Sequence, residues 1–161
     1  MRITNLTVLA LTLCILSSGC DSKSAISFNK RARAYYEQGE FEKAIVDLTK
    51  AIELDPTHAS SYNNRGEVYR QQGELDKAIA DYNKAIELDP TYAIAYNNRG
   101  LAYNNQGELD KAFVDFNKAI ELDPTYAIAY YNRGSLYQGQ GEVEKANLNF
   151  AKAKELGYEP E

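Results

Sequence analysis

The sequence AIAYNNRGLAYNNQGELDKAFVDFNKAIELDPTY, residues Ala93–Tyr126, decides the fold of this chain, because the rest of the chain repeats it. A shift of 34 residues places this segment over Ala59–Tyr92 with 25 of 34 positions identical. Weaker copies occupy Ala25–His58 and Ala127–Pro160. An exact period of this length indicates stacked supersecondary units, each of which buries its apolar face against a neighbour.

Each unit predicts two antiparallel helices. In the third unit, Tyr96, Gly100 and Tyr103 lie on one face of a helix that we expect to end at Gly107. A second helix follows and ends before Pro124, which blocks its continuation. Its apolar face is formed by Ala112, Phe116 and Ala119.

The recurring residues occupy fixed offsets in the units. In the second unit they are Tyr62, Gly66, Tyr69, Ala78, Tyr82, Ala85 and Pro90. At these positions the chain resembles the tetratricopeptide repeat (TPR) family, whose aromatic, small and proline residues have the same spacing. The resemblance implies an all-α fold in which helix-turn-helix units stack into a solenoid, a right-handed superhelix.

Two features depart from the TPR pattern. The family's leucine before the glycine is an arginine in every unit, and the glycine itself is Ala32 in the first unit. An inward-facing guanidinium needs an acid or carbonyl groups to offset its lost hydration. We expect three arginine–aspartate pairs between the helices of a unit, namely Arg31–Asp47, Arg65–Asp81 and Arg99–Asp115. The alternative partners are the corner aspartates Asp55, Asp89 and Asp123.

The first 24 residues resemble the leader of a bacterial lipoprotein. The apolar run Leu6–Leu16 follows a single positive charge at Arg2, and Ile3–Leu16 is too short to cross a bilayer. The sequence Ser17–Cys20 resembles a lipoprotein box, so we expect acylation of Cys20 after cleavage. The alternative is a plain signal peptide and a secreted soluble protein.

The predicted organisation follows from these assignments. It comprises a signal peptide at residues 1–19, a lipidated tether at 20–24, and TPR units at 25–58, 59–92, 93–126 and 127–160. Asp21 resembles the signal that retains lipoproteins of enteric bacteria on the inner membrane, so we expect a periplasm-facing envelope protein there, with the outer membrane as the alternative.

Composition argues against several classes of function. The net charge of −5 disfavours nucleic acid as a partner, since phosphate binding needs a basic surface. Both cysteines, Cys14 and Cys20, lie in the leader, and His58 is the single histidine. We expect no metal site, no cofactor and no enzymatic activity.

Differences between the second and third units mark one face of the first helix. They include Ser60/Ile94, Glu67/Leu101 and Gln71/Asn105. The TPR resemblance implies that this face lines a concave peptide-binding groove. In-phase amides at its centre can hydrogen-bond a peptide backbone. The predicted groove residues are Lys30, Arg33, Asn64, Glu67, Gln71, Asn98, Leu101, Asn105 and Asn132. Tyr36 and Tyr131 lie off the core pattern and are expected to be exposed.

The fourth unit is expected to cap the array. Asn147 and Lys154 replace apolar residues that a following unit would cover in the earlier repeats. The predicted function is a membrane-anchored, non-catalytic adaptor that binds a protein or peptide segment and helps assemble an envelope complex. The alternative is a structural protein that associates with itself through the ends of the array.

Overall fold

The computed structural model describes residues 23–159. The predicted signal peptide, Cys20 and Asp21 lie outside the described residues. The first described helix occupies residues 23–37. The others are α2 (Phe41–Leu54), α3 (Ala59–Gln71), α4 (Leu75–Leu88), α5 (Ala93–Asn105), α6 (Leu109–Leu122), α7 (Ala127–Gly139) and α8 (Val143–Glu155).

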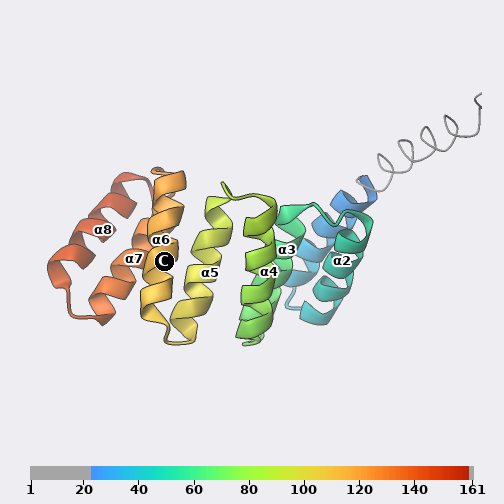
Figure 1. Ribbon diagram of the computed structural model, residues 1–161, viewed down its shortest axis with the longest axis horizontal. Coiled ribbons are helices and arrows are strands. Elements are labelled where there is room, and N and C mark those ends of the chain that lie inside the picture. Colours follow the sequence, from blue (N-terminus) through green and yellow to red (C-terminus); the bar gives the residue numbers. More distant parts are fainter. Residues whose placement is uncertain (1–22, 160–161) are drawn as a thin grey trace, which may run out of the picture.

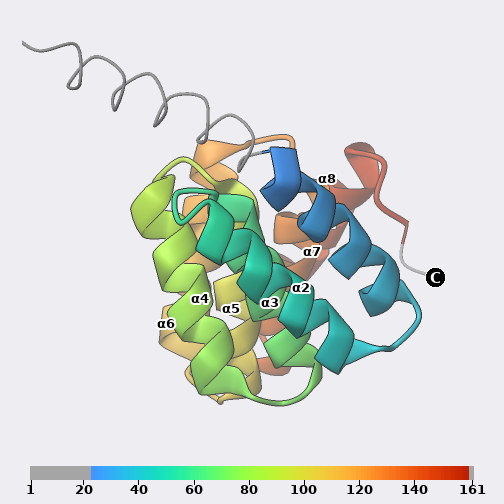
Figure 2. The ribbon, with the colours of Figure 1, turned by 90° about the vertical axis from the view of Figure 1, so that its right-hand side faces the viewer.

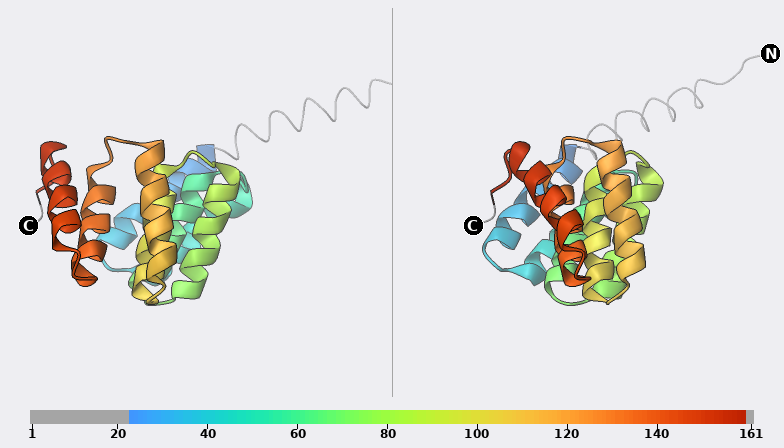
Figure 3. Two further views of the ribbon diagram at one scale, coloured as in Figure 1. Left: turned by 60° about the vertical axis from the view of Figure 1, so that its left-hand side comes forward. Right: turned by 90° about the vertical axis from the view of Figure 1, so that its left-hand side faces the viewer.

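The helices form a solenoid of antiparallel pairs. Figure 1 shows α2 to α8 side by side in chain order along the long axis. Viewed along this row, the helix over residues 23–37 is nearest the viewer in Figure 2 and α8 is nearest in the right-hand view of Figure 3, so the two lie at opposite ends. Within residues 23–159 all regular structure is helical, and none of these helices is long and apolar enough to cross a membrane. The all-α solenoid expected from the sequence is confirmed.

Glycine ends the first helix of each pair. Gly107 has a φ of 78°, a left-handed conformation that glycine adopts without a steric penalty. The next amide, of Glu108, donates to the Tyr103 carbonyl oxygen at 2.9 Å, which closes the helix end. The same conformation recurs at Gly39, Gly73 and Gly141. This local geometry turns the chain into the second helix of each unit.

An aromatic ring over a glycine forms the core of three helix pairs. A Cβ atom at Gly100 would lie 2.8 Å from a ring carbon of Phe116, so the site admits only glycine unless the ring moves. The equivalent pairs are Gly66–Tyr82 and Gly134–Phe150. The first unit differs, because Ala32 packs with Leu48, and each is 1% exposed.

The first helix of each pair lies on the inner side of the curve. Helix α3 contacts α5, and α5 contacts α7, whereas no Cα atoms of α4 and α6 approach within 8 Å. Helices that contact across successive units occupy the shorter, concave side of a solenoid. The face predicted as a groove therefore belongs to the inner layer of helices.

Candidate functional site

The arginine that recurs at one offset of every unit joins the two helices of its own unit. Arg65 donates through Nε and Nη2 to the two carboxylate oxygens of Asp81, both at 2.8 Å. Arg31 makes the same paired contact with Asp47, and Arg99 makes it with Asp115. The structure thus brings together all three pairs expected from the sequence.

The corner aspartates have a different role. Asp89 accepts hydrogen bonds from the backbone amide and hydroxyl of Thr91, at 2.9 and 2.7 Å. Asp123 accepts the same two bonds from Thr125. These bonds stabilise the turn between units.

The same arginines also connect neighbouring units, which the sequence did not indicate. Arg65 donates through Nη1 to the Thr49 hydroxyl at 3.1 Å, and Arg99 donates to the Asn83 side-chain oxygen at 2.7 Å. Both acceptors lie on the second helix of the preceding unit. The Arg99 guanidinium carbon also lies 5.5 Å from the centre of the Tyr96 ring. Such cation–π contact helps to offset the desolvation of the guanidinium.

An unbroken chain of asparagine hydrogen bonds crosses the inner helices. Its links between units are Asn132 to Asn97, Asn98 to Asn63 and Asn64 to Asn29, at 2.8, 3.1 and 2.7 Å. Its links within units are Asn97 to Asn98 and Asn63 to Asn64. Asn29 is the last asparagine of the chain, and it donates back to the Ser61 hydroxyl of the second unit at 2.7 Å.

This chain gives the amide row a role within the fold that the sequence did not indicate. The amino groups of Asn64, Asn98 and Asn132 each donate one hydrogen bond to an amide of the preceding unit, and each has a second N–H. Their partners Asn63 and Asn97 are buried, at 4% and 1% exposed. The sequence signal for these partners was the Asn–Asn doublet at the same offset in two units.

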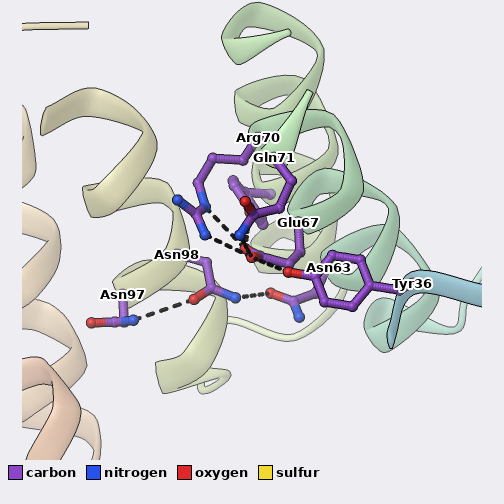
Figure 4. Close-up of polar contacts among 8 residues, drawn as sticks. Tyr36, Asn63, Glu67, Arg70, Gln71, Asn97 and Asn98 are labelled. Atoms are coloured by element: carbon purple, nitrogen blue, oxygen red, sulfur yellow. Dashed lines mark hydrogen bonds and ion pairs between the residues drawn. The ribbon is translucent and has the colours of Figure 1, made fainter. Parts of the chain in front are cut away.

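Glu67 is the centre of a second polar cluster on the inner face (Figure 4). Its carboxylate accepts from Arg70 at 2.6 and 3.0 Å, and from Gln71 at 3.1 Å. It also accepts from the hydroxyl groups of Tyr36 and Tyr82, at 3.0 and 3.2 Å. Residues of the first helix, α3 and α4 therefore converge on one carboxylate.

Sequence reasoning placed Glu67 and Gln71 on this face but missed their partners. Tyr36 was expected to be exposed, yet it is half-buried because its ring packs on Phe41 and its hydroxyl reaches Glu67. Tyr82 was predicted only as a recurring residue of the repeat, without a bond to Glu67. The available signal was that α4 has tyrosine where α6 and α8 have phenylalanine. Tyr131 is likewise half-buried, against Phe150 and Tyr158.

The charge of Glu67 is stabilised where it lies. Burial by itself raises the pKa of the Glu67 carboxyl, but the hydrogen bonds and charge of Arg70 outweigh this, so that its pKa lies below the usual value. Burial also raises the pKa values of Tyr36 and Tyr82, which keeps both hydroxyl groups protonated as donors.

Replacing Glu67 with Gln is expected to lower the free energy of unfolding by roughly 1–3 kcal/mol at pH 7, because charge-assisted hydrogen bonds are lost. A lowered carboxyl pKa contributes stability above the unfolded value of about 4.3, and that contribution is lost as the pH falls through the folded value. The difference between wild type and variant should therefore shrink below about pH 4. Urea unfolding of both proteins at a series of pH values measures this difference in the free energy of unfolding. Glu37→Gln, at an exposed position, is the control, and a difference that does not depend on pH would contradict the ionic role.

The inner face changes character along the array. Leu101 takes the place of Glu67 in the third unit and is half-buried, while Ile94 and Ile128 are 43% and 39% exposed. Lys30 and Arg33 are exposed at the other end, where Arg33 Nε donates to Glu37 at 3.0 Å. Asn105 is exposed. Charged side chains thus gather on the first two units, while exposed isoleucines recur at one offset, at Ile26, Ile94 and Ile128.

Residues 23–159 contain no group of three or more histidine, cysteine, aspartate or glutamate side chains that could hold a metal ion. The inner face of the helices forms instead a concave surface with exposed apolar and charged side chains. Such surfaces recognise other molecules by complementarity.

Comparison with protein-family models identifies the repeat. TPR models match residues 32–69, 66–107, 93–126 and 116–146. The chain belongs to the tetratricopeptide repeat family. TPR units are scaffolds for protein–protein interaction, and the inner face described above is their concave side. A search of curated proteins gave no match.

Solved TPR structures share this architecture. A crystal structure of MamA is 34% identical, with a TM-score of 0.72 over 82% of this chain and 77% of that chain. The first TPR domain of Spaghetti (RPAP3), bound to the HSP90 peptide SRMEEVD, is 27% identical, with a TM-score of 0.66 over 81% and 95%. The Arabidopsis OM64 TPR domain is 25% identical, with a TM-score of 0.71 over 74% and 98%.

Proposed function

We propose that this TPR protein is a membrane-anchored, non-catalytic adaptor that binds an extended segment of a partner protein in its concave groove and helps assemble an envelope complex. The observation that carries the proposal is the inner face itself. It exposes Ile94 and Ile128 beside Leu101, on helices that the asparagine chain holds in fixed register. Apolar side chains exposed on a rigid concave surface are typical of a recognition site.

The charged residues of the groove determine the direction in which a ligand lies along it. Lys30 and Arg33 make the rim positive at the first unit, and their exposed side chains attract an acidic part of a ligand. Leu101 and its exposed neighbours favour a bulky apolar side chain further along. The peptide bound to the TPR domain of Spaghetti supports a segment of protein as the class of ligand.

Photo-crosslinking in living cells tests the groove. A photoreactive residue at Leu101 is expected to capture a partner protein. The matched control is Val114, which is 65% exposed on α6 in the outer layer of helices. Ile94→Ser should abolish capture from the inner position without changing the circular dichroism spectrum. Capture from Val114 alone would assign binding to the outer face and contradict the proposal.

Alanine at Asn64, Asn98 and Asn132 together is expected to weaken partner binding about tenfold or more, and also to lower stability. Each lost hydrogen bond costs about 0.5–1.5 kcal/mol, and these bonds join successive units. Urea unfolding and binding of the captured partner measure the two effects. Asn147→Ala, at an exposed position on α8 in the outer layer of helices, is the control. A triple variant with unchanged binding would exclude this part of the groove.

The anchor makes a separate prediction. Cys20→Ala should release the protein from the membrane fraction of a bacterial host, because the apolar run before it is too short to span the bilayer and several acyl chains hold a protein firmly. Mass spectrometry of the mature N-terminus should show an acylated Cys20 in the wild type. Cys14→Ala is the control. An N-terminus at another residue would leave the soluble secreted form as the better description.

A further inference from the structure

A pocket of about 210 Å³ opens on the inner face between the first helix and α3. Its floor consists of three core residues, Ala32, Leu48 and Val68, each 1% exposed. Its walls and rim are formed by Arg33, Tyr36, Asn64 and Glu67. The pocket reaches the surface at Arg33, whose side chain is 79% exposed.

The pocket coincides with the one unit that lacks the aromatic–glycine pair. In the other units a ring lies directly on the inner helix, as Phe116 does on Gly100. Leu48 stands at the ring position of the first unit, and the added methyl group of Ala32 does not fill the space of a ring. Protein interiors are otherwise close-packed, so this exchange of residue types accounts for the space.

The walls select an apolar occupant. Tyr36 donates to Glu67, and the Glu67 carboxylate is already held by Arg70, Gln71 and Tyr82. The Asn64 amide is used on both sides, since it donates to Asn29 and accepts from Asn63. Within the described residues no buried side-chain polar atom lacks a partner. The floor of the pocket offers apolar contacts alone, so a polar group placed on it would lose its hydration without a hydrogen bond from Ala32, Leu48 or Val68.

The size and the rim define the ligand further. An apolar cavity of about 150 Å³ accommodates benzene, whereas sites for drug-sized molecules begin at about 300 Å³. A volume of about 210 Å³ thus fits one large side chain. Arg33 at the mouth and Lys30 one turn earlier on the same helix are both exposed cations, and Arg33 donates to Glu37 only through Nε, which leaves its two Nη groups for a ligand. They complement an acidic neighbour of that side chain.

We infer that this pocket binds one large aliphatic or aromatic side chain of the partner segment, next to an acidic residue held at Lys30 and Arg33. The inference rests on the proposed groove function and names its specificity site. Leu48 and Ala32 are the residues that determine this specificity, because they create a space that the other units fill with their own aromatic ring.

A displayed library of random linear peptides, selected on the full chain in detergent, supplies the probe. Recovered peptides are expected to share a large apolar residue beside aspartate or glutamate. A labelled synthetic peptide then measures affinity by fluorescence anisotropy. The double variant Ala32→Gly, Leu48→Phe rebuilds the pair found in the third and fourth units and closes the pocket. It should fold, and it should weaken binding more than tenfold, as expected for loss of one buried side chain.

Two further variants separate the possible failures. Arg33→Glu, at an exposed position, should weaken binding and remove the preference for acidic residues. Leu101→Ser alters the groove away from the pocket. Peptides that respond to Leu101→Ser but bind the closed pocket with wild-type affinity would overturn the pocket inference and leave the groove intact. A library that yields no binder, or binders insensitive to every variant, would overturn the groove proposal itself.

Methyl NMR of the wild type gives a readout that depends on no variant. On addition of the selected peptide, the methyl resonances of Leu48 and Val68 should shift, whereas those of Val114 and Leu148 on the outer helices should not. Unchanged Leu48 and Val68 resonances at saturating peptide would contradict insertion into the pocket.

Discussion

Replacement of Asp81 with Ala is expected to lower the free energy of unfolding by about 3–5 kcal/mol, because it leaves a largely buried guanidinium without its partner. Asp81 is 6% exposed and accepts two hydrogen bonds from Arg65, whose side chain is 18% exposed. The loss should also weaken the contact of Arg65 with Thr49 in the preceding unit. Urea unfolding monitored by circular dichroism measures the change.

The fourth unit provides a natural comparison for Asp81→Asn. There Asn149 accepts from Arg133 at 2.9 Å, and its amino group donates to the Lys145 carbonyl oxygen at 2.8 Å. Asp81→Asn can adopt this arrangement, so it should cost less than Asp81→Ala. Glu87→Ala, which breaks an exposed ion pair with Lys84, should leave the midpoint unchanged. Equal stability of wild type and Asp81→Ala would show that the pair contributes nothing.

Deletion of residues 127–161 is expected to produce aggregation or a markedly lower melting temperature. The fourth unit supplies Leu136, which is 5% exposed and lies in one core cluster with Phe116. It also supplies Tyr137, whose ring meets Phe113 edge-on at 5.0 Å. Solenoid stability depends on such contacts between neighbours, so the deletion removes part of the third unit's own core.

A point substitution and a truncation at the other end test whether the deletion acts through lost packing or only through a shorter chain. Leu136→Ala alone should cost about 2–5 kcal/mol, the usual range for a buried leucine. A chain beginning at Ala25 keeps the same clusters and should unfold cooperatively. Asn147 and Lys154 are exposed on α8, as expected of a capping helix. Equal melting curves for the wild type and the chain that lacks residues 127–161 would contradict the capping role.

The sequence by itself determined the architecture, because its signals are local and repeat with an exact period. The glycine at 107 and the proline at 124 predicted the ends of α5 and α6, which the structure places at Asn105 and Leu122. The arginine–aspartate pairs were also predictable, since both partners recur in phase within one helix pair. Within one unit, the short loop between the two helices determines which of their faces meet.

Only the tertiary structure decided what the inner face offers. The asparagine bonds join residues 35 positions apart, and Glu67 gathers donors from three helices. Both depend on the distance and rotation between successive units, which are set by packing. The repeated Asn–Asn doublet marked the residues, but only the packed helices showed which partners they bond. The pocket at Leu48 arises in the same way. A periodic pattern identifies an aromatic residue replaced by leucine, but only the packed helices show that the space remains open.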